Sequence, residues 1–156
     1  IECVSKLKRG SRVLFVCGSL DVEANYNRLS GFFSAMESDV LEEKSLRYAV
    51  CTDSKDMTDG VSFCDWSLIL CSDDVVCMRL LDILREKKIK IGVDVKIASF
   101  HDSVLLESCV PPITALRVDA FALGEKSSEL ALKVSNGEEC ETMNYVDCSF
   151  MMRSSI

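Results

Sequence analysis

The chain has 156 residues, which is the size of one domain or of a large part of a bigger one. Apolar residues make up 48% of it and charged residues 28%, so the sequence can form a buried core, and this composition argues against intrinsic disorder. Acidic residues outnumber basic residues by 25 to 18, a formal charge of −7, which argues against direct binding of nucleic acid or of anionic lipid because both need a basic face.

The chain begins with alternating strand and helix patterns. Residues 12–18 (RVLFVCG) predict a strand buried on both faces, as in a parallel sheet. Asp21 is expected to cap the helix that follows. One apolar stripe of that helix is formed by Leu29, Phe32, Phe33 and Met36. Residues 45–51 predict a second strand, and the polar stretch 52–65 predicts no secure helix.

The middle of the chain predicts a strand at 66–71 and a helix from Ser72 or Asp73 to about Lys88. The core-facing stripe of this helix consists of Val76, Leu80, Ile83 and Leu84. A second apolar face is formed by Val75, Met78 and Leu81. A helix that is apolar on two sides is buried on two sides, either by its own sheet plus another segment or by a partner subunit.

The last third predicts three extended segments and one long helix. Residues 95–100 predict the fourth strand, and 101–112 predict an irregular loop that ends in two prolines. Residues 113–118 are extended, a helix follows from Asp119 to about Asn136, and a last extended segment covers 143–153. One face of the helix carries Ala120, Leu123, Leu130, Ala131 and Val134.

Strands that alternate with helices predict the α/β class, a three-layer parallel sheet with helices on both faces. Such sheets bind small ligands beyond the carboxyl ends of their strands. The loops at these ends are residues 18–27, 52–63, 72–74 and 101–109.

The cysteines are predicted to be reduced and mostly buried, which is typical of a cytoplasmic protein. Their number, nine, is odd, and none is in a C-x-x-C pair. His101 is the only histidine, so we expect no metal site and no other cofactor. No apolar run approaches the roughly 20 residues that a membrane span needs.

Seven short motifs occur in a specific order between Gly10 and Ser155. They read RVLFVCGSLD, NRLSGFFSAM, LILCSDDVV, KIGVDVKIASFHD, PPITAL, ALGEKSSELAL and MRSS. In this order and spacing they resemble the effector-binding region of the lactose-repressor/galactose-repressor (LacI/GalR) family of bacterial transcription regulators.

The resemblance implies a periplasmic-binding-protein-like (type I) fold and only the later half of such a regulator. It implies that residues 1–116 form the C-terminal effector-binding subdomain. Residues 117–147 would cross back to the N-terminal subdomain, and 148–156 would form a closing strand. We expect Ile1 to be a cut edge, with the helix-turn-helix headpiece, the hinge and the first half of the effector domain absent. Operator DNA would be bound only through that missing headpiece.

Arg28 matches the effector-contacting arginine of the family's N-R-L-x-G-F motif. A guanidinium offers a rigid fork of donors for hydroxyls, carboxylates or phosphates. The alternative is a surface arginine paired with Glu23 or Asp21.

Ser72 and Asp73 occupy a motif that reads Asn-Asp in the family. Asp73 is expected to cap the following helix, whereas Ser72 is the better candidate for a ligand contact. His101 stands where the family usually has an acidic residue, and it is followed by Asp102. We expect His101 to contact the ligand and Asp102 to contact it or to brace the loop. An imidazole in place of a carboxylate favours a phosphorylated or acidic ligand over a neutral sugar, or else a loss of classical sugar binding.

The resemblance implies a homodimer, with an interface on the 74–88 helix and the 101–110 loop. Its residues would be Val75, Met78, Leu81 and Cys109. The expected function is effector binding and dimerisation in a DNA-binding regulator, a repressor, whose effector is a sugar, a sugar phosphate or a nucleoside-like molecule. The alternative is a solute-binding protein of a transport system.

An enzyme is not expected. Cys71 and His101 both end strands, but nothing lowers the pKa of that thiol, and its apolar neighbours would raise it. No G-x-S-x-G, P-loop or G-x-G-x-x-G motif occurs.

Overall fold

The computed structural model describes residue 3 and residues 7–38, 46–52 and 61–156. Among these residues a six-stranded sheet has the strand order β2-β1-β3-β4-β5-β6. The strands are β1 Arg12–Val16, β2 Arg47–Cys51, β3 Leu68–Cys71, β4 Lys96–Ser99, β5 Thr114–Val118 and β6 Cys148–Met151. The helices are α2 Glu23–Met36, the 3₁₀ turn η1 Phe63–Asp65, α4 Asp74–Glu86, α5 Val104–Glu107 and α6 Ala120–Ser135. Ser45 and most of the 52–65 stretch lie outside the described residues.

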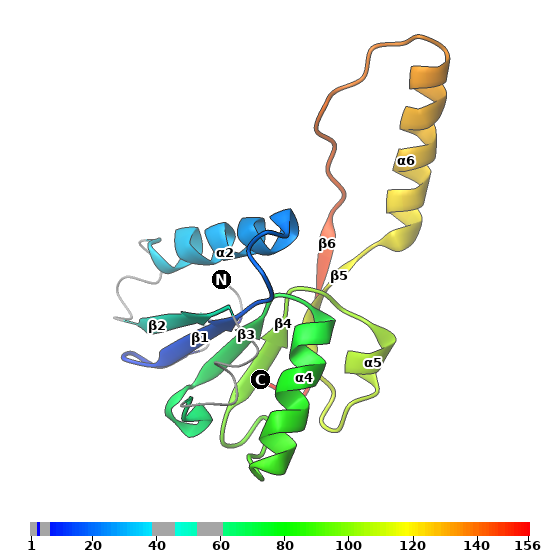
Figure 1. The fold of residues 1–156 in the computed structure, drawn as a ribbon. Helices are drawn as coiled ribbons and strands as arrows, with labels where there is room; N and C mark the ends of the chain where they lie inside the picture. Colours follow the sequence, from blue (N-terminus) through cyan, green and yellow to red (C-terminus); the bar gives the residue numbers. More distant parts are fainter. Residues whose placement is uncertain (1–2, 4–6, 39–45, 53–60) are drawn as a thin grey trace.

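The α/β class is confirmed, with one correction to the parallel sheet. Strands β1 to β5 run parallel, but β6 is antiparallel to β5, with Leu116 opposite Phe150. After α6 the chain returns directly beside β5 without crossing the sheet (Figure 1). A direct return of this kind can only produce an antiparallel pair. The predicted segment 143–153 is a strand only over Cys148–Met151.

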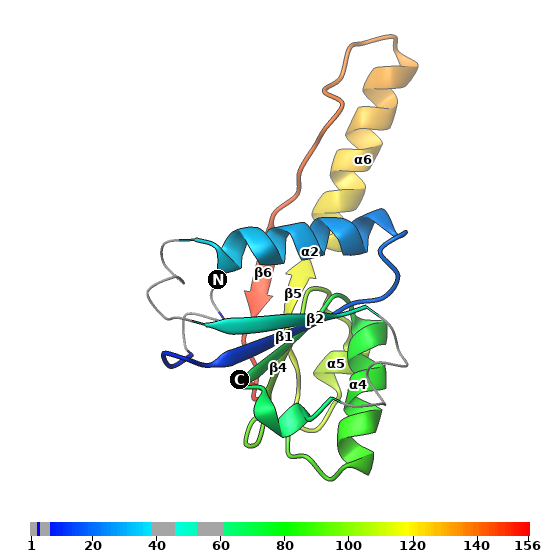
Figure 2. The ribbon, with the colours of Figure 1, turned by 60° about the vertical axis from the view of Figure 1, so that its left-hand side comes forward.

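The sheet is covered on both faces, as the sequence predicts. Helix α2 lies on one face, and α4 with α5 lies on the other (Figures 1 and 2). Side chains alternate along β1, so that Val13 and Phe15 join the core under α2 whereas Leu14 and Val16 join the core under α4. This burial on two sides explains the continuous apolar runs of β1 (residues 13–16) and β3 (Leu68–Cys71).

Helix α2 forms with the predicted stripe but without the predicted cap. Leu29, Phe32 and Met36 are buried. The helix begins after Val22, which makes no side-chain cap, and the carboxylate of Asp21 accepts a hydrogen bond from the Ser19 hydroxyl instead (3.0 Å). A short local hydrogen bond of this kind competes with capping.

The second apolar face of α4 is covered only in part, at Leu81, by another segment of the same chain, whereas Val75 is exposed and Met78 is half-buried. Residues 101–112 are not wholly irregular, because α5 forms one helical turn within them. Leu106 of that turn is fully buried in the core cluster that includes Leu81, and Cys109 packs against the same cluster. The burial of one leucine fixes the turn against α4, which loop composition alone did not reveal.

The end of the chain locks β4 to β5. The hydroxyl of Ser155, which is fully buried, accepts from the Thr114 backbone N–H (2.8 Å) and donates to the Ile97 carbonyl (2.7 Å). The Ile97 N–H donates in turn to the Ser155 carbonyl (3.0 Å). These bonds join strands that share only a short ladder, from Ala98–Thr114 to Ser99–Ala115.

Gly92→Ala is expected to destabilise the fold by about 1–3 kcal/mol. Gly92 has a φ of +81°, and an added Cβ would lie 2.7 Å from the backbone oxygen of Ser154. The added methyl group would therefore displace Ser154, which lies in the segment that joins β4 to β5. The matched control is Gly124→Ala, where nothing lies within 4 Å and helix α6 should be unharmed. Urea unfolding measures both, and equal midpoints would contradict this prediction.

An arm, residues 119–147, projects beyond the sheet on β5 and β6 (Figure 1). It contains α6, capped by Asp119, and none of the residues of α6 is buried. Apolar side chains on it are exposed, among them Phe121, Leu132 and Val134.

None of the helices in the described part of the chain combines the length and the apolar character that a membrane span requires.

The nine cysteines form no disulfide. Five of them, Cys3, Cys17, Cys51, Cys71 and Cys77, are buried in the two core clusters, as predicted. Cys64 and Cys148 are exposed, so the prediction of core packing does not hold for them.

Candidate functional site

Three of the four predicted loops meet at the carboxyl edge of the sheet. The backbone joins them directly, since Ser72 N–H donates to the Val16 carbonyl (2.8 Å) and Phe100 N–H donates to the Cys71 carbonyl (2.9 Å). The ends of β1, β3 and β4 are therefore adjacent. The fourth loop lies largely outside the described residues. The arm rises from this same edge, because β5 runs parallel to β4 and leads into α6 (Figure 2).

Arg28 lies in the second turn of α2, near the end of the helix that faces this edge. Its side chain is half-buried and makes no ion pair with any residue that the structure describes. The alternative pairing with Glu23 or Asp21 is not present, since Asp21 bonds to Ser19. A half-buried guanidinium without a counter-charge keeps its donors available for an anion or for hydroxyl groups.

Ser72 lies beneath the surface of the edge. It is fully buried, and its hydroxyl donates to one oxygen of Asp73 (2.8 Å). The other oxygen of Asp73 accepts from the Val76 N–H (2.8 Å), which confirms the predicted cap of α4. Ser72 thus holds the Asp73 side chain in its capping position, and the hydroxyl proton of Ser72 is already used in this hydrogen bond.

The Cys71 thiol is poorly suited to act as a nucleophile. A hydrogen bond with Cys77, together with complete burial, raises the pKa of Cys71 well above its ordinary value. A thiol with a raised pKa stays protonated near neutral pH and attacks slowly.

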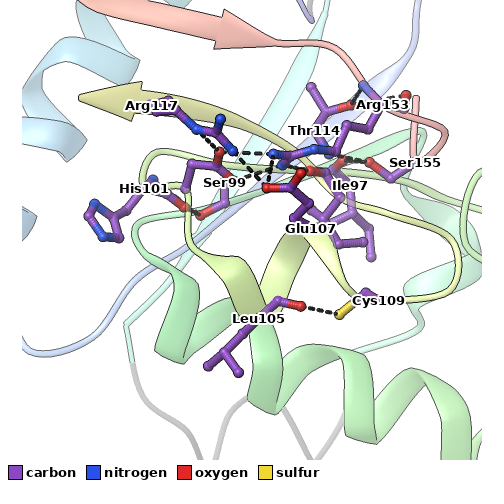
Figure 3. A network of polar contacts seen from close by, with 12 residues as sticks. Ile97, Ser99, His101, Leu105, Glu107, Cys109, Thr114, Arg117, Arg153 and Ser155 are labelled. Carbon is purple, nitrogen blue, oxygen red and sulfur yellow. Dashed lines mark hydrogen bonds and ion pairs between the residues drawn. The ribbon is translucent and has the colours of Figure 1, made fainter. Parts of the chain in front are cut away.

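His101 is exposed at the edge, but its backbone is held firmly. The Ser99 hydroxyl donates to the His101 carbonyl (2.7 Å), and the His101 N–H approaches the same hydroxyl oxygen (3.2 Å). The imidazole points away from the neighbouring ion pairs (Figure 3). It is therefore presented to solvent by a fixed backbone.

Asp102 is enclosed by two arginines. Its carboxylate, which is only 1% exposed, accepts from Arg117 Nε (2.7 Å) and from both terminal nitrogens of Arg153 (2.7 and 2.9 Å). Burial alone would raise the pKa of Asp102, but the hydrogen bonds from Arg153 and Arg117 outweigh it and hold the pKa below its ordinary value. Both oxygens are occupied, so the geometry favours bracing of the loop over contact with a ligand.

Sequence reasoning missed the two arginines and a neighbouring serine. Arg117 and Arg153 are 15 and 51 residues away from Asp102, and no local pattern pairs them. The hydroxyl of Ser103 is enclosed and has no hydrogen-bond partner among the described residues. A buried hydroxyl of this kind normally has a hydrogen-bond partner, so Ser103 is a further polar group near His101 whose hydrogen-bonding capacity is unused among the described residues.

The four residues expected at a dimer interface differ in exposure. Val75 is exposed, whereas Met78 and Cys109 are half-buried and their sulfur atoms lie 3.8 Å apart. Leu81 is only 3% exposed and packs inside its own chain, so it offers little surface to a partner. Beside it, a hollow of about 250 Å³ lies between the end of α4 and Val110.

A family model described as a periplasmic binding protein-like domain matches residues 7–156. The curated relatives include the HTH-type transcriptional regulators MalR of Staphylococcus xylosus and CelR of Thermobifida fusca. Each is 24% identical to this chain, over 83% and 92% of it respectively. The chain spans only 40% and 44% of the length of these two relatives.

Solved structures share the fold. A LacI family transcriptional regulator from Bifidobacterium animalis has a TM-score of 0.75 and 22% identity, covering 94% of this chain and 55% of that protein. A periplasmic binding protein/LacI transcriptional regulator from Alkaliphilus metalliredigens, solved in complex with D-xylulofuranose, has a TM-score of 0.76 and 18% identity. It covers 99% of this chain and 59% of that protein.

Proposed function

The chain belongs to the periplasmic binding protein-like domain family, and from this premise we propose that it is the effector-binding and dimerisation region of a bacterial DNA-binding transcriptional regulator of the LacI/GalR type, a repressor. Both relatives named above are helix-turn-helix regulators, which favours this function over a solute-binding protein of a transport system. Such a regulator would act in the cytoplasm, and it would contact operator DNA only through a headpiece outside this chain.

The observation that carries the proposal is the meeting of three loops at the edge from which the arm rises. In this arrangement residues 1–116 form one lobe and residues 117–147 cross toward a second lobe, with 148–156 closing the first. The apolar side chains of α6, none of them buried, support a covering lobe. A small molecule would then bind between the two lobes.

Two residues are proposed as direct contacts. Arg28 would donate hydrogen bonds to the effector, and His101 would offer one donor and one acceptor, or two donors when protonated. Ser72 and Asp102 would support these contacts from below the surface, Ser72 through Asp73 and Asp102 through its arginines. A sugar, a sugar phosphate or a nucleoside-like effector fits this donor set. A phosphorylated or acidic effector fits it best, because the half-buried Arg28 carries a positive charge and the exposed His101 can donate hydrogen bonds to an anion.

Effector binding would act on DNA binding through a difference in contact energy between two states of a homodimer. A coupling of about 1–3 kcal/mol would suffice. Two headpieces must match two half-sites, so the regulator must pair. We place the interface on the α4 and α5 side, around Val75, Met78 and Cys109, with Leu81 beneath them.

Arg28→Ala is expected to weaken effector binding by about 10- to 100-fold, because a charge-assisted hydrogen bond contributes about 1.5–3 kcal/mol. Calorimetry on the full-length protein, screened against sugars, sugar phosphates and nucleosides, measures the effect. Arg9→Ala is the matched control, since Arg9 is exposed and precedes β1, at the opposite edge of the sheet. Unchanged affinity in Arg28→Ala would remove this residue from the site.

A further inference from the structure

One carboxylate joins three segments that are far apart in the sequence. Asp102 directly follows His101, Arg117 lies in β5, and Arg153 follows β6. Asp102, Glu107, Arg117 and Arg153 together form the Asp102 cluster. Within it, Glu107 accepts a hydrogen bond from Arg117 (2.9 Å), and its carboxylate lies 3.6 Å from the guanidinium of Arg153 (Figure 3). Two arginines face two carboxylates, so the formal charges of the cluster cancel.

The cluster is attached to β5 near both ends of the strand. Arg117 lies one residue before the end of the strand. At the start of the strand, Arg153 donates to the Ile113 carbonyl (2.6 Å), and its backbone N–H donates to the Thr114 hydroxyl (2.9 Å). The two strands that carry the arm are therefore attached to the residue next to His101.

We infer that Asp102 is a positioning residue that makes the His101 loop and the base of the arm a single mechanical unit, so that a ligand that displaces the loop also displaces the arm. The physical reason is the free energy that would be needed to separate the His101 loop from the base of the arm. Arg153 is 11% exposed and holds Asp102 in a two-pronged arrangement, which has a narrow preferred geometry. Moving the loop alone would leave two opposite charges buried without partners.

The inference rests on the proposed function only for the identity of the ligand. The mechanical link itself is a property of the chain, and it can be measured with no effector present. If Arg28→Ala left effector affinity unchanged, the link between loop and arm could still be tested by itself. If the link were absent, the proposal of effector binding would still stand.

The test changes the arm strands and observes the loop. In the full-length protein, Arg117→Gln and, separately, Arg153→Gln are expected to speed amide hydrogen exchange at Phe100 and His101 at least fivefold, measured by NMR. The amides of β1 and β3 should keep their wild-type rates. Arg117 is 42% exposed, so its variant is expected to fold even if the Arg153 variant does not.

The matched control is Arg85→Gln, which removes an exposed ion pair with Asp82 on α4 (2.8 Å). It should leave the exchange rates at Phe100 and His101 unchanged. Unchanged loop exchange in Arg117→Gln would overturn the inference. A uniform acceleration across β1, β3 and the loop would also overturn it, because that pattern reports a general loss of stability.

Discussion

Replacing Asp102 by alanine is expected to lower the free energy of unfolding by about 3–5 kcal/mol. The substitution leaves the nearly buried Arg153 with only the more distant and exposed Glu107 carboxylate (3.6 Å) as a counter-charge, and it removes the shorter of the two ion pairs of Arg117. Asp82→Ala removes the carboxylate of an exposed pair and should cost less than about 1 kcal/mol. Urea unfolding of both variants at pH 7 provides the comparison. Similar losses in the free energy of unfolding would show that the buried carboxylate stabilises the fold no more than an exposed one does.

The contribution of Asp102 should disappear in acid. Its folded pKa is lower than the value of about 3.9 typical of an unfolded aspartate, so the folded state favours the ionised form. The stabilisation is therefore fully present above about pH 4 and is lost as the pH falls through the folded pKa. The difference in stability between wild type and Asp102→Ala should stay constant from pH 7 to pH 5 and shrink below pH 4. A difference that grows in acid would contradict this sign.

Replacing Phe15 by alanine should cost about 3–5 kcal/mol, because it leaves a cavity in the core beneath α2. The ring is fully buried, stacked on Phe32 with centroids 5.0 Å apart and edge-on to Phe100 at 5.8 Å. Phe15 thus holds both the helix that carries Arg28 and the start of the His101 loop against the sheet.

Chemical denaturation measures the Phe15 effect, with Phe15→Leu as a milder variant if the alanine form does not fold. Tyr26→Ala is the matched control, since that ring is 59% exposed on α2, and its loss should change stability by less than about 0.5 kcal/mol. A loss below about 1 kcal/mol for Phe15→Ala would mean that α2 is held mainly by other contacts.

The sequence alone determined the layered architecture. The apolar runs that became β1 and β3 needed burial on two faces, and their alternation with amphipathic helices predicts a parallel sheet covered by helices on both faces. The period of the apolar stripe placed α2 and α4 within a few residues of their observed bounds. The resemblance to LacI/GalR regulators, carried by motifs in order, is confirmed by the family match and by the relatives.

Only the tertiary structure decided how distant segments pair. The antiparallel β6, the single turn of α5 and the enclosure of Asp102 all depend on contacts across many residues, such as the 51 between Asp102 and Arg153. Local propensity and periodicity describe a residue's own neighbours along the chain. Whether a carboxylate at a strand end is open to a ligand or clasped by two arginines depends on which strands fold back beside it.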